Sequence, residues 1–279
     1  MSNVLARTLS GVLYVVVVVG CLIGGMSTYC VLFAIITALL LNEFNTLLSR
    51  HNIAKVNNTV SVVSGVYLFL AMYLYNSAMM GEVVFVPYVL SLIFMLVSGL
   101  YLPQGNVVSN WAYGFAGQFY VALPMSLMNV LAFNQIYDYT LPLALFVFLW
   151  LNDTGAYCFG CSLGKKIPYK LFPSVSPKKS WIGSVGGGLV VLVGAACFFW
   201  FGGSGSLLFW LGLGLVVCVF GTWGDLVESQ FKRQLGIKDS GNFMPGHGGV
   251  LDRFDSALLA IPAAVVYIFL FSGGFVGLF

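Results

Sequence analysis

The sequence predicts an all-α integral membrane protein that crosses the bilayer about nine times and keeps its amino terminus in the cytoplasm. Three observations lead to this fold class. The composition is too apolar for a soluble protein, apolar stretches of membrane-spanning length recur along the whole chain, and the basic residues all fall on one side of the resulting arrangement.

The composition requires lipid as the main solvent. Only 8% of the 279 residues are charged, against roughly 25% in soluble domains. Hydrophobic residues make up 59% and the mean hydropathy is +0.96, so a soluble fold would expose large apolar patches and aggregate. The net charge of +3 allows an acidic lipid as a partner and gives no reason to expect nucleic acid.

Nine stretches approach the length of about 20 apolar residues that a helix needs to cross a bilayer. They cover residues 9–25, 27–48, 59–77, 82–101, 111–133, 139–160, 181–201, 206–224 and 256–277. The first resembles the apolar core of a signal peptide. We expect it to be retained, because no small-residue cleavage site follows it and eight further stretches do.

The basic residues predict the orientation of these nine helices. With nine crossings, all twelve lysines and arginines lie on the side of the amino terminus, and the opposite loops carry only Glu82 and Asp138. The positive-inside rule therefore places the amino terminus in the cytoplasm. The twelve are Arg7, Arg50, Lys55, Lys165, Lys166, Lys170, Lys178, Lys179, Lys232, Arg233, Lys238 and Arg253.

Small residues inside the apolar stretches are interpreted as packing residues. Gly183 and Gly187, with the run 186–188, are typical of closely packed membrane helices. Cys158 and Cys161 form a C-x-x-C pair, but the chain has no second pair and no βαβ pattern. We therefore expect these thiols to pack as small hydrophobic groups rather than to bind metal or act in redox chemistry.

Two long connections on the cytoplasmic side, about 160–180 and 223–255, hold nine of the twelve basic residues. No internal repeat or linker is visible. We expect one membrane domain over 1–279, with amino-terminal helices in 1–138 and the catalytic helices and cytoplasmic loops in 139–279.

The second connection carries the strongest functional pattern. If the eighth helix continues beyond the membrane, Asp225, Glu228, Ser229 and Lys232 recur at i, i+3, i+4 and i+7 and share one face. Charged runs are usually solvated helix ends. This run stands out because the rest of the chain carries so little charge.

The same connection ends in a glycine turn followed by two more carboxylates. Asp252 and Asp255 are three residues apart at the start of the ninth helix, and the turn 245–249 reads PGHGG. Its glycines let backbone N–H groups approach an anion closely. Mg²⁺ typically takes one or two carboxylates plus substrate phosphates, and lysine or arginine neutralises the remaining phosphate charge. The residues predict metal-assisted phosphoryl or nucleotidyl transfer at the inner membrane surface.

Other polar residues lie near the ends of the apolar stretches or in the loops. Asp153 lies at the end of the sixth stretch, where an unpaired carboxylate is costly unless it serves a wet cavity or a partner, so we expect it to be functional. Glu43 lies at the end of the second stretch, nearer the headgroups, so its position is a weaker indication of a functional role than that of Asp153. His51 is interpreted as a loop residue, whereas His247 is expected to touch phosphate or hold the turn.

Residues 229–255 read S-x-x-K-R-x4-K-D-x-G-x3-P-G-H-G-G-V-x-D-R-F-D. This segment resembles the diagnostic segment of the CDP-diacylglycerol synthase (phosphatidate cytidylyltransferase) family. A second stretch, with NDTGAY at 152–157, GK at 164–165 and SPKKSW at 176–181, is similar to the family as well. Together they cover roughly the last 130 residues. The first half resembles the family only as a series of apolar spans.

The resemblance implies transfer of a cytidylyl group from CTP to phosphatidic acid with Mg²⁺, and it leaves room for a second cation. It also suggests a homodimer in the plasma (inner) membrane with an active site that faces the cytoplasm. The catalytic residues would be Asp225, Lys232, Asp252 and Asp255, with Asp225, Asp252 and Asp255 as metal ligands. The substrate-binding residues would be Asp153, Lys165, Lys178, Lys179, Ser229, Arg233, His247, Gly248, Gly249 and Arg253.

One position departs from the pattern, because Ile182 stands between Trp181 and Gly183 where the family is expected to have an acidic residue.

Two rival functions are a transporter and a different kind of lipid enzyme. A transporter would place carboxylates nearer the membrane midplane, often in broken helices or inverted repeats, whereas this chain gathers them at one face. Another lipid phosphotransferase or a lipid kinase is the other alternative. The D-G-x2-A-R…G-x3-D-x3-D pattern of the CDP-alcohol phosphotransferases is absent.

Overall fold

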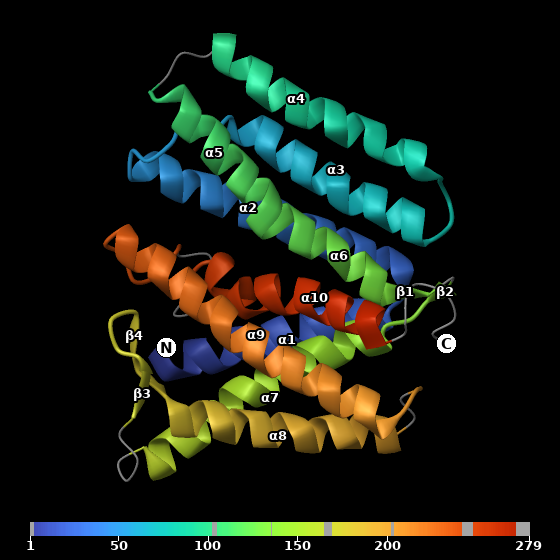
Figure 1. Ribbon diagram of the computed structural model, residues 1–279, viewed down its shortest axis with the longest axis vertical. Helices are drawn as coiled ribbons and strands as arrows, with labels where there is room; N and C mark the ends of the chain where they lie inside the picture. The colour runs from blue at the N-terminus through green and yellow to red at the C-terminus, as the bar shows by residue number, and fades with distance from the viewer. Residues whose placement is uncertain are drawn as a thin grey trace. The chain divides into compact units, whose positions relative to one another are not determined.

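The computed structural model describes residues 3–101, 105–134, 136–164, 169–201, 204–241 and 248–271. Eight helical segments in these residues are long and apolar enough to cross a membrane, and a ninth apolar helix, Thr8–Ile23 within α1, is shorter. The prediction of an all-α membrane protein with about nine apolar helices is therefore confirmed (Figure 1). The helices are α1 (Asn3–Ile23), α2 (Met26–Arg50), α3 (Asn58–Asn76), η1 (Glu82–Phe85), α4 (Val86–Tyr101), α5 (Val107–Gly117), η2 (Gln118–Ala122), α6 (Leu123–Ala132), α7 (Thr140–Leu163), α8 (Trp181–Trp200), α9 (Leu207–Gln234) and α10 (Leu251–Phe271).

Two differences from the sequence prediction concern the helices that carry the charged segment. The 28 residues of α9 run to Gln234, ten residues beyond the predicted end of that apolar stretch. At 1.5 Å per residue α9 is about 40 Å long, longer than the hydrocarbon core of about 30 Å. α10 starts at Leu251, five residues earlier than predicted. Both helices thus extend into the polar sequence.

The chain divides into two compact units. The first contains residues 1–139 and 239–253, and the second contains residues 140–238 and 254–279. The long α10 contributes its first three residues to the first unit and the remainder to the second.

In the first unit, α2, α3 and the continuous run α5–η2–α6 pack around a buried aromatic cluster. The Tyr29 ring lies 5.0 Å from Phe33 and 6.1 Å from Phe69, between ring centroids. The Tyr29 hydroxyl donates to Asn129 Oδ1 at 3.2 Å, so the one polar atom of the ring is satisfied. The short β1–β2 hairpin (Phe133–Asn134 with Ile136–Tyr137) follows α6 in this unit.

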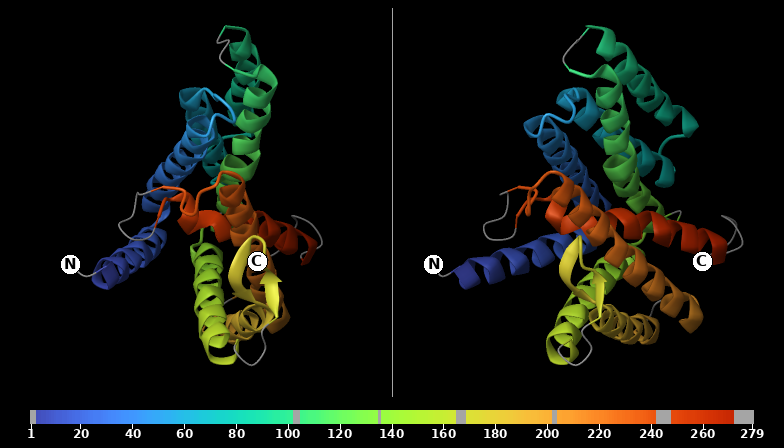
Figure 2. Two further views of the ribbon diagram at one scale, coloured as in Figure 1. Left: turned by 90° about the vertical axis from the view of Figure 1, so that its left-hand side faces the viewer. Right: turned by 60° about the vertical axis from the view of Figure 1, so that its left-hand side comes forward.

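In the second unit, α7, α8 and α9 pack against one another, and α8 follows α7 closely over its length (Figures 1 and 2). The close approach depends on glycine. A Cβ on Gly187 would lie 2.7 Å from the Asn152 carbonyl oxygen, and one on Gly183 would lie 2.9 Å from the Ala156 carbonyl oxygen. The predicted packing role of these glycines is confirmed. Gly188 instead has room, with only Cys218 Sγ at 3.6 Å.

A β hairpin joins α7 to α8. β3 (Lys170–Phe172) pairs with β4 (Ser176–Ser180) in antiparallel register (Figure 2). Ser180, the last residue of β4, caps α8 by accepting a hydrogen bond from the Gly183 amide at 3.2 Å. The cap fixes the lysine-bearing strand directly to the start of α8.

Candidate active site

A pocket of about 340 Å³ opens in the second unit, within the size range of small-molecule sites. Its walls come from α7, β4, α8, α9 and the Ser256 position of α10. Two carboxylates, Asp153 and Asp225, and two lysines, Lys178 and Lys179, face it. Four predicted site residues, separated by up to 72 positions, are therefore brought to one place.

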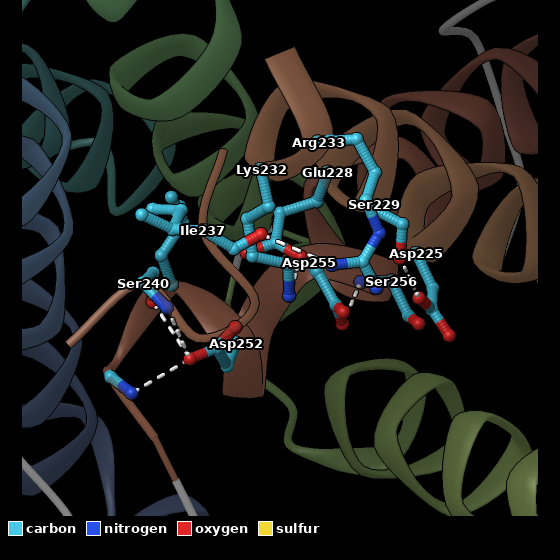
Figure 3. A network of polar contacts seen from close by, with 12 residues as sticks. Asp225, Glu228, Ser229, Lys232, Arg233, Ile237, Ser240, Asp252, Asp255 and Ser256 are labelled. Atoms are coloured by element: carbon cyan, nitrogen blue, oxygen red, sulfur yellow. Dashed lines mark hydrogen bonds and ion pairs between the residues drawn. The ribbon is translucent and has the colours of Figure 1, made fainter. Parts of the chain in front are cut away.

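Asp225 is held by two neighbouring side chains. Its Oδ2 lies 2.5 Å from Lys179 Nζ. Its Oδ1 accepts a hydrogen bond from the Ser229 hydroxyl at 3.1 Å (Figure 3). The Asp225 and Lys179 side chains are 31% and 25% exposed, so both reach solvent. The lysine was predicted to bind phosphate, and in the structure it pairs with a carboxylate that was predicted to bind metal.

Asp255 lies in the same electrostatic environment. Asp225 and Asp153 are both near enough to interact with its carboxyl group, whose Oδ1 accepts a hydrogen bond from the Ser256 amide at 2.6 Å. Three carboxylates are thus gathered within one unit, a grouping that favours a bound cation because their like charges repel one another.

The end of α9 carries two more predicted residues. Lys232 forms a buried ion pair with Glu228, one turn earlier in the helix, and the Glu228 side chain has no exposed surface. The Arg233 guanidinium donates to the Ile237 carbonyl oxygen at 3.1 Å (Figure 3). It also donates to the Val175 carbonyl oxygen at 3.4 Å. α9 runs through Lys232, which meets the condition under which Asp225, Glu228, Ser229 and Lys232 share one face.

The first unit holds the glycine turn and Asp252. Asp252 Oδ2 accepts hydrogen bonds from the Ser240 amide at 2.9 Å, the Ser240 hydroxyl at 2.9 Å and the Gly249 amide at 2.8 Å (Figure 3). Gly248 has a φ of +81°, which favours glycine. The Gly249 amide, which was expected to help bind phosphate, donates to Asp252 in this structure.

Glu43 is the residue that sequence reasoning undervalued. Its carboxylate accepts hydrogen bonds from the Val250 amide at 2.8 Å and from the Leu251 amide at 3.2 Å, and its Oε1 contacts Ser240 Oγ. Glu43, like Asp153, is a carboxylate at the end of an apolar stretch, and such a position indicates a functional role. No local pattern indicated that its partners lie some 200 residues away.

The remaining predicted residues divide into two groups. Arg253 is described, and its buried Nε has no hydrogen-bond partner among the described residues. Lys165 and His247 lie outside the described residues.

The structure also places three residues that the sequence analysis singled out for other reasons. Ile182 is half-buried in the first turn of α8, and Cys158 and Cys161 are exposed free thiols. Cys161 lies on the rim of the pocket.

The donor set of the second unit suits Mg²⁺, because carboxylate oxygens are the ligands that this hard cation prefers. Within the described residues, no three histidine, cysteine, aspartate or glutamate side chains converge so as to hold a metal alone. Mg²⁺ does not require such a cage, since it usually takes one or two carboxylates and completes its shell with water and substrate phosphates. Asp225, with Asp153 and Asp255 close by, fits that mode of binding.

A pocket that combines carboxylates and lysines within a membrane helical bundle has the charges to hold a phosphorylated substrate. Comparison with known families makes this specific. Residues 5–271 match the model of the cytidylyltransferase family, and the chain belongs to that family of nucleotidyl-transferring enzymes.

The names of two similar proteins specify one enzyme within this family. The chain is 32% identical over 263 residues to the phosphatidate cytidylyltransferase of Staphylococcus aureus (strain COL), which covers 92% of this chain and 95% of the relative. It is 46% identical over 119 residues to the phosphatidate cytidylyltransferase of Staphylococcus haemolyticus, which covers 42% of this chain and 44% of the relative. The similarity to the first relative therefore extends over nearly the whole length of both chains.

Proposed function

We propose that the protein transfers the cytidylyl group of CTP to phosphatidic acid and so produces CDP-diacylglycerol and pyrophosphate. The observation that carries this proposal is the similarity over 95% of the length of a relative named phosphatidate cytidylyltransferase. The pocket in the second unit supports it, because it combines lysines with carboxylates in a protein built mainly of long apolar helices.

The reaction balances without redox chemistry. A phosphate oxygen of phosphatidic acid forms a bond to the α-phosphorus of CTP, and the bond from that phosphorus to the bridging oxygen of pyrophosphate breaks. The attacking phosphate is already ionised near neutral pH, so no strong general base is required. Catalysis then depends on positioning and on neutralising phosphate charge.

The lysines of β4 are the residues best suited to hold phosphate oxygens in the pocket. Lys178 and Lys179 come from adjacent positions of the hairpin strand, and both line the pocket. Lys179 is already held beside Asp225, which orients its ammonium group before substrate arrives. Arg233 contributes indirectly, because its hydrogen bond to Val175 fastens α9 to the turn that precedes β4.

Asp225 would hold Mg²⁺, with Asp153 and Asp255 supporting it. That Asp252 also binds a metal ion stays a prediction from the sequence. When bound, the metal would neutralise charge on the phosphates during the transfer. The carboxylates of the chain provide the negative charge that retains such a cation. A second cation and a homodimer stay predictions.

We further propose that the pocket faces the cytoplasm, where CTP is made, and that the protein lies in the plasma (inner) membrane. The support comes from the charge distribution. If the nine apolar helices cross in sequence, all twelve basic residues fall on the side of the amino terminus.

The test uses the purified full-length protein in detergent with CTP, phosphatidic acid and Mg²⁺. CDP-diacylglycerol and pyrophosphate should form in equal amounts, with no product from the protein alone or without lipid. Asp225→Asn should lower kcat by several orders of magnitude across a Mg²⁺ titration. Asp138→Asn, a change of the same kind in a predicted external loop, should leave turnover unaltered. Absence of nucleotide-lipid product, together with solute movement in sealed vesicles, would favour the transporter instead.

A further inference from the structure

The start of α10 is held by a residue from a distant helix. The first N–H groups of a helix have no acceptor within the helix, and Ser, Thr, Asp or Asn usually supplies one from the capping position. Here the residue before α10 is Val250, whose apolar side chain cannot accept a hydrogen bond. Glu43 of α2 supplies the acceptors instead, at 2.8 Å from the Val250 amide and 3.2 Å from the Leu251 amide.

The same carboxylate is joined to Asp252 through one hydroxyl group. Ser240 Oγ contacts Glu43 Oε1 and lies 2.9 Å from Asp252 Oδ2. The Ser240 amide and the Gly249 amide also donate to Asp252 Oδ2, at 2.9 and 2.8 Å. Three donors on one oxygen leave the Asp252 carboxyl group little freedom to rotate.

The backbone packs closely against these groups at two glycines. A Cβ on Gly249 would collide with Glu43 Oε1 and with Ser240 Oγ, and one on Gly241 would lie 3.3 Å from the Glu43 carboxylate. Ser240 is only 3% exposed. The backbone therefore passes directly over the Glu43 carboxylate, and glycine at these positions permits the approach.

We propose that Glu43 is a positioning residue for the cytidylyl transfer. It holds Ser240, Val250 and the first turn of α10 so that Asp252 is presented in one orientation. The effect of Glu43 on the reaction rate depends on the proposed function, whereas its contacts with Ser240, Val250 and Leu251 do not. Glu43 acts through Ser240 and the α10 amides, so it makes the amino-terminal helices part of the reaction machinery.

The central variant is Glu43→Gln, which keeps the size of the side chain and removes its charge. Losing hydrogen bonds to a charged group should lower kcat about 10- to 100-fold, while KM for CTP changes by less than about 3-fold, because the effect falls on orientation rather than binding. The concentration of Mg²⁺ needed for half-maximal activity should rise. Glu82→Gln, an exposed glutamate at the start of η1, serves as the matched control and should behave as wild type.

A structural readout runs in parallel and does not depend on turnover. Hydrogen exchange by mass spectrometry should show faster exchange of the Val250 and Leu251 amides in Glu43→Gln, with unchanged exchange in α7 and α8 as the sign of a folded protein. Ser240→Ala removes the bridging hydroxyl and should cause a similar loss. The double variant should lose less activity than the product of the two single losses, because both changes break the same network.

The outcomes separate the two proposals. Wild-type protein that makes no CDP-diacylglycerol would refute the proposed function, and the exchange measurement would still decide whether Glu43 holds the turn. Normal kcat, normal Mg²⁺ dependence and unchanged exchange in Glu43→Gln would overturn the positioning role. Multiplicative effects in the double variant would equally show that Glu43 and Ser240 act independently, against the inference. If Glu43→Gln unfolds globally, Ser240→Ala provides the same two readouts.

Discussion

The ion pair between Glu228 and Lys232 leads to a prediction about stability. The Glu228 side chain has no exposed surface and that of Lys232 is 10% exposed. Removing one partner of a buried pair leaves an uncompensated charge and typically costs about 3–5 kcal/mol. We expect Glu228→Gln to lower the free energy of unfolding by that amount, although it removes no volume.

A matched pair in the same unit provides the control. Lys179 and Asp225 also form an ion pair, but their side chains are 25% and 31% exposed. Solvent screens such a pair, and pairs of this kind contribute about 1 kcal/mol or less. Lys179→Met should therefore change stability far less than Glu228→Gln. The double variant Glu228→Gln/Lys232→Met should recover most of the loss, because no buried charge is left unpaired.

The assay is unfolding of the purified protein in mixed micelles with increasing dodecyl sulfate, followed by circular dichroism. The quantity compared is the difference in unfolding free energy between each variant and the wild type. If Glu228→Gln is as stable as the wild type, or if Lys179→Met is the more damaging change, the assignment of the buried pair as a structural element is wrong.

Three further predictions concern the orientation of the protein in the membrane, Gly249 and Ile182 of α8. In a background without exposed native thiols, a cysteine at Lys170 should resist an impermeant thiol reagent in intact cells while one at Asp138 should react; the reverse result would invert the orientation. Gly249→Ala should reduce the yield of folded, active protein, because its Cβ would collide with the Glu43 carboxylate; full activity and yield would contradict the packing. Ile182→Glu should fold normally and retain at least wild-type turnover, because Ile182 is half-buried in a first helical turn without an acidic residue, where a negative charge is favourable. Loss of folded protein would show that it is needed for packing.

The glycine prediction has its own control in α1. A Cβ on Gly20 would meet nothing within 4 Å, so Gly20→Ala should leave yield and activity unchanged. This variant separates a general effect of replacing glycine from the collision expected at the turn.

The membrane fold was predictable from the sequence because hydropathy and helix length follow directly from the bilayer as solvent. The continuation of α9 through Lys232 was also predictable, since the polar residues kept a helical spacing. The packing of α8 on α7 could be anticipated from Gly183 and Gly187. In each case the relevant information lies within about one or two helical turns of the chain.

The candidate site was predictable in its residues but not in its contacts. The acidic and basic positions were recognised from local motifs, whereas the pairing of Lys179 with Asp225 joins residues 46 positions apart. The Glu43 contact to Val250 spans 207 positions. Such contacts depend on how helices pack in three dimensions, and a single sequence carries no local pattern for them.

The distance along the chain between Glu43 and α10 has a consequence for biosynthesis. At about 5–20 residues per second, the ribosome needs roughly 10–40 s after making Glu43 before Val250 and Leu251 emerge. During that interval the carboxylate is in the membrane without its final partners. α10 must therefore be inserted and docked before Glu43 can hold the Val250 and Leu251 amides, so a nascent chain would gain activity only after α10 has been made.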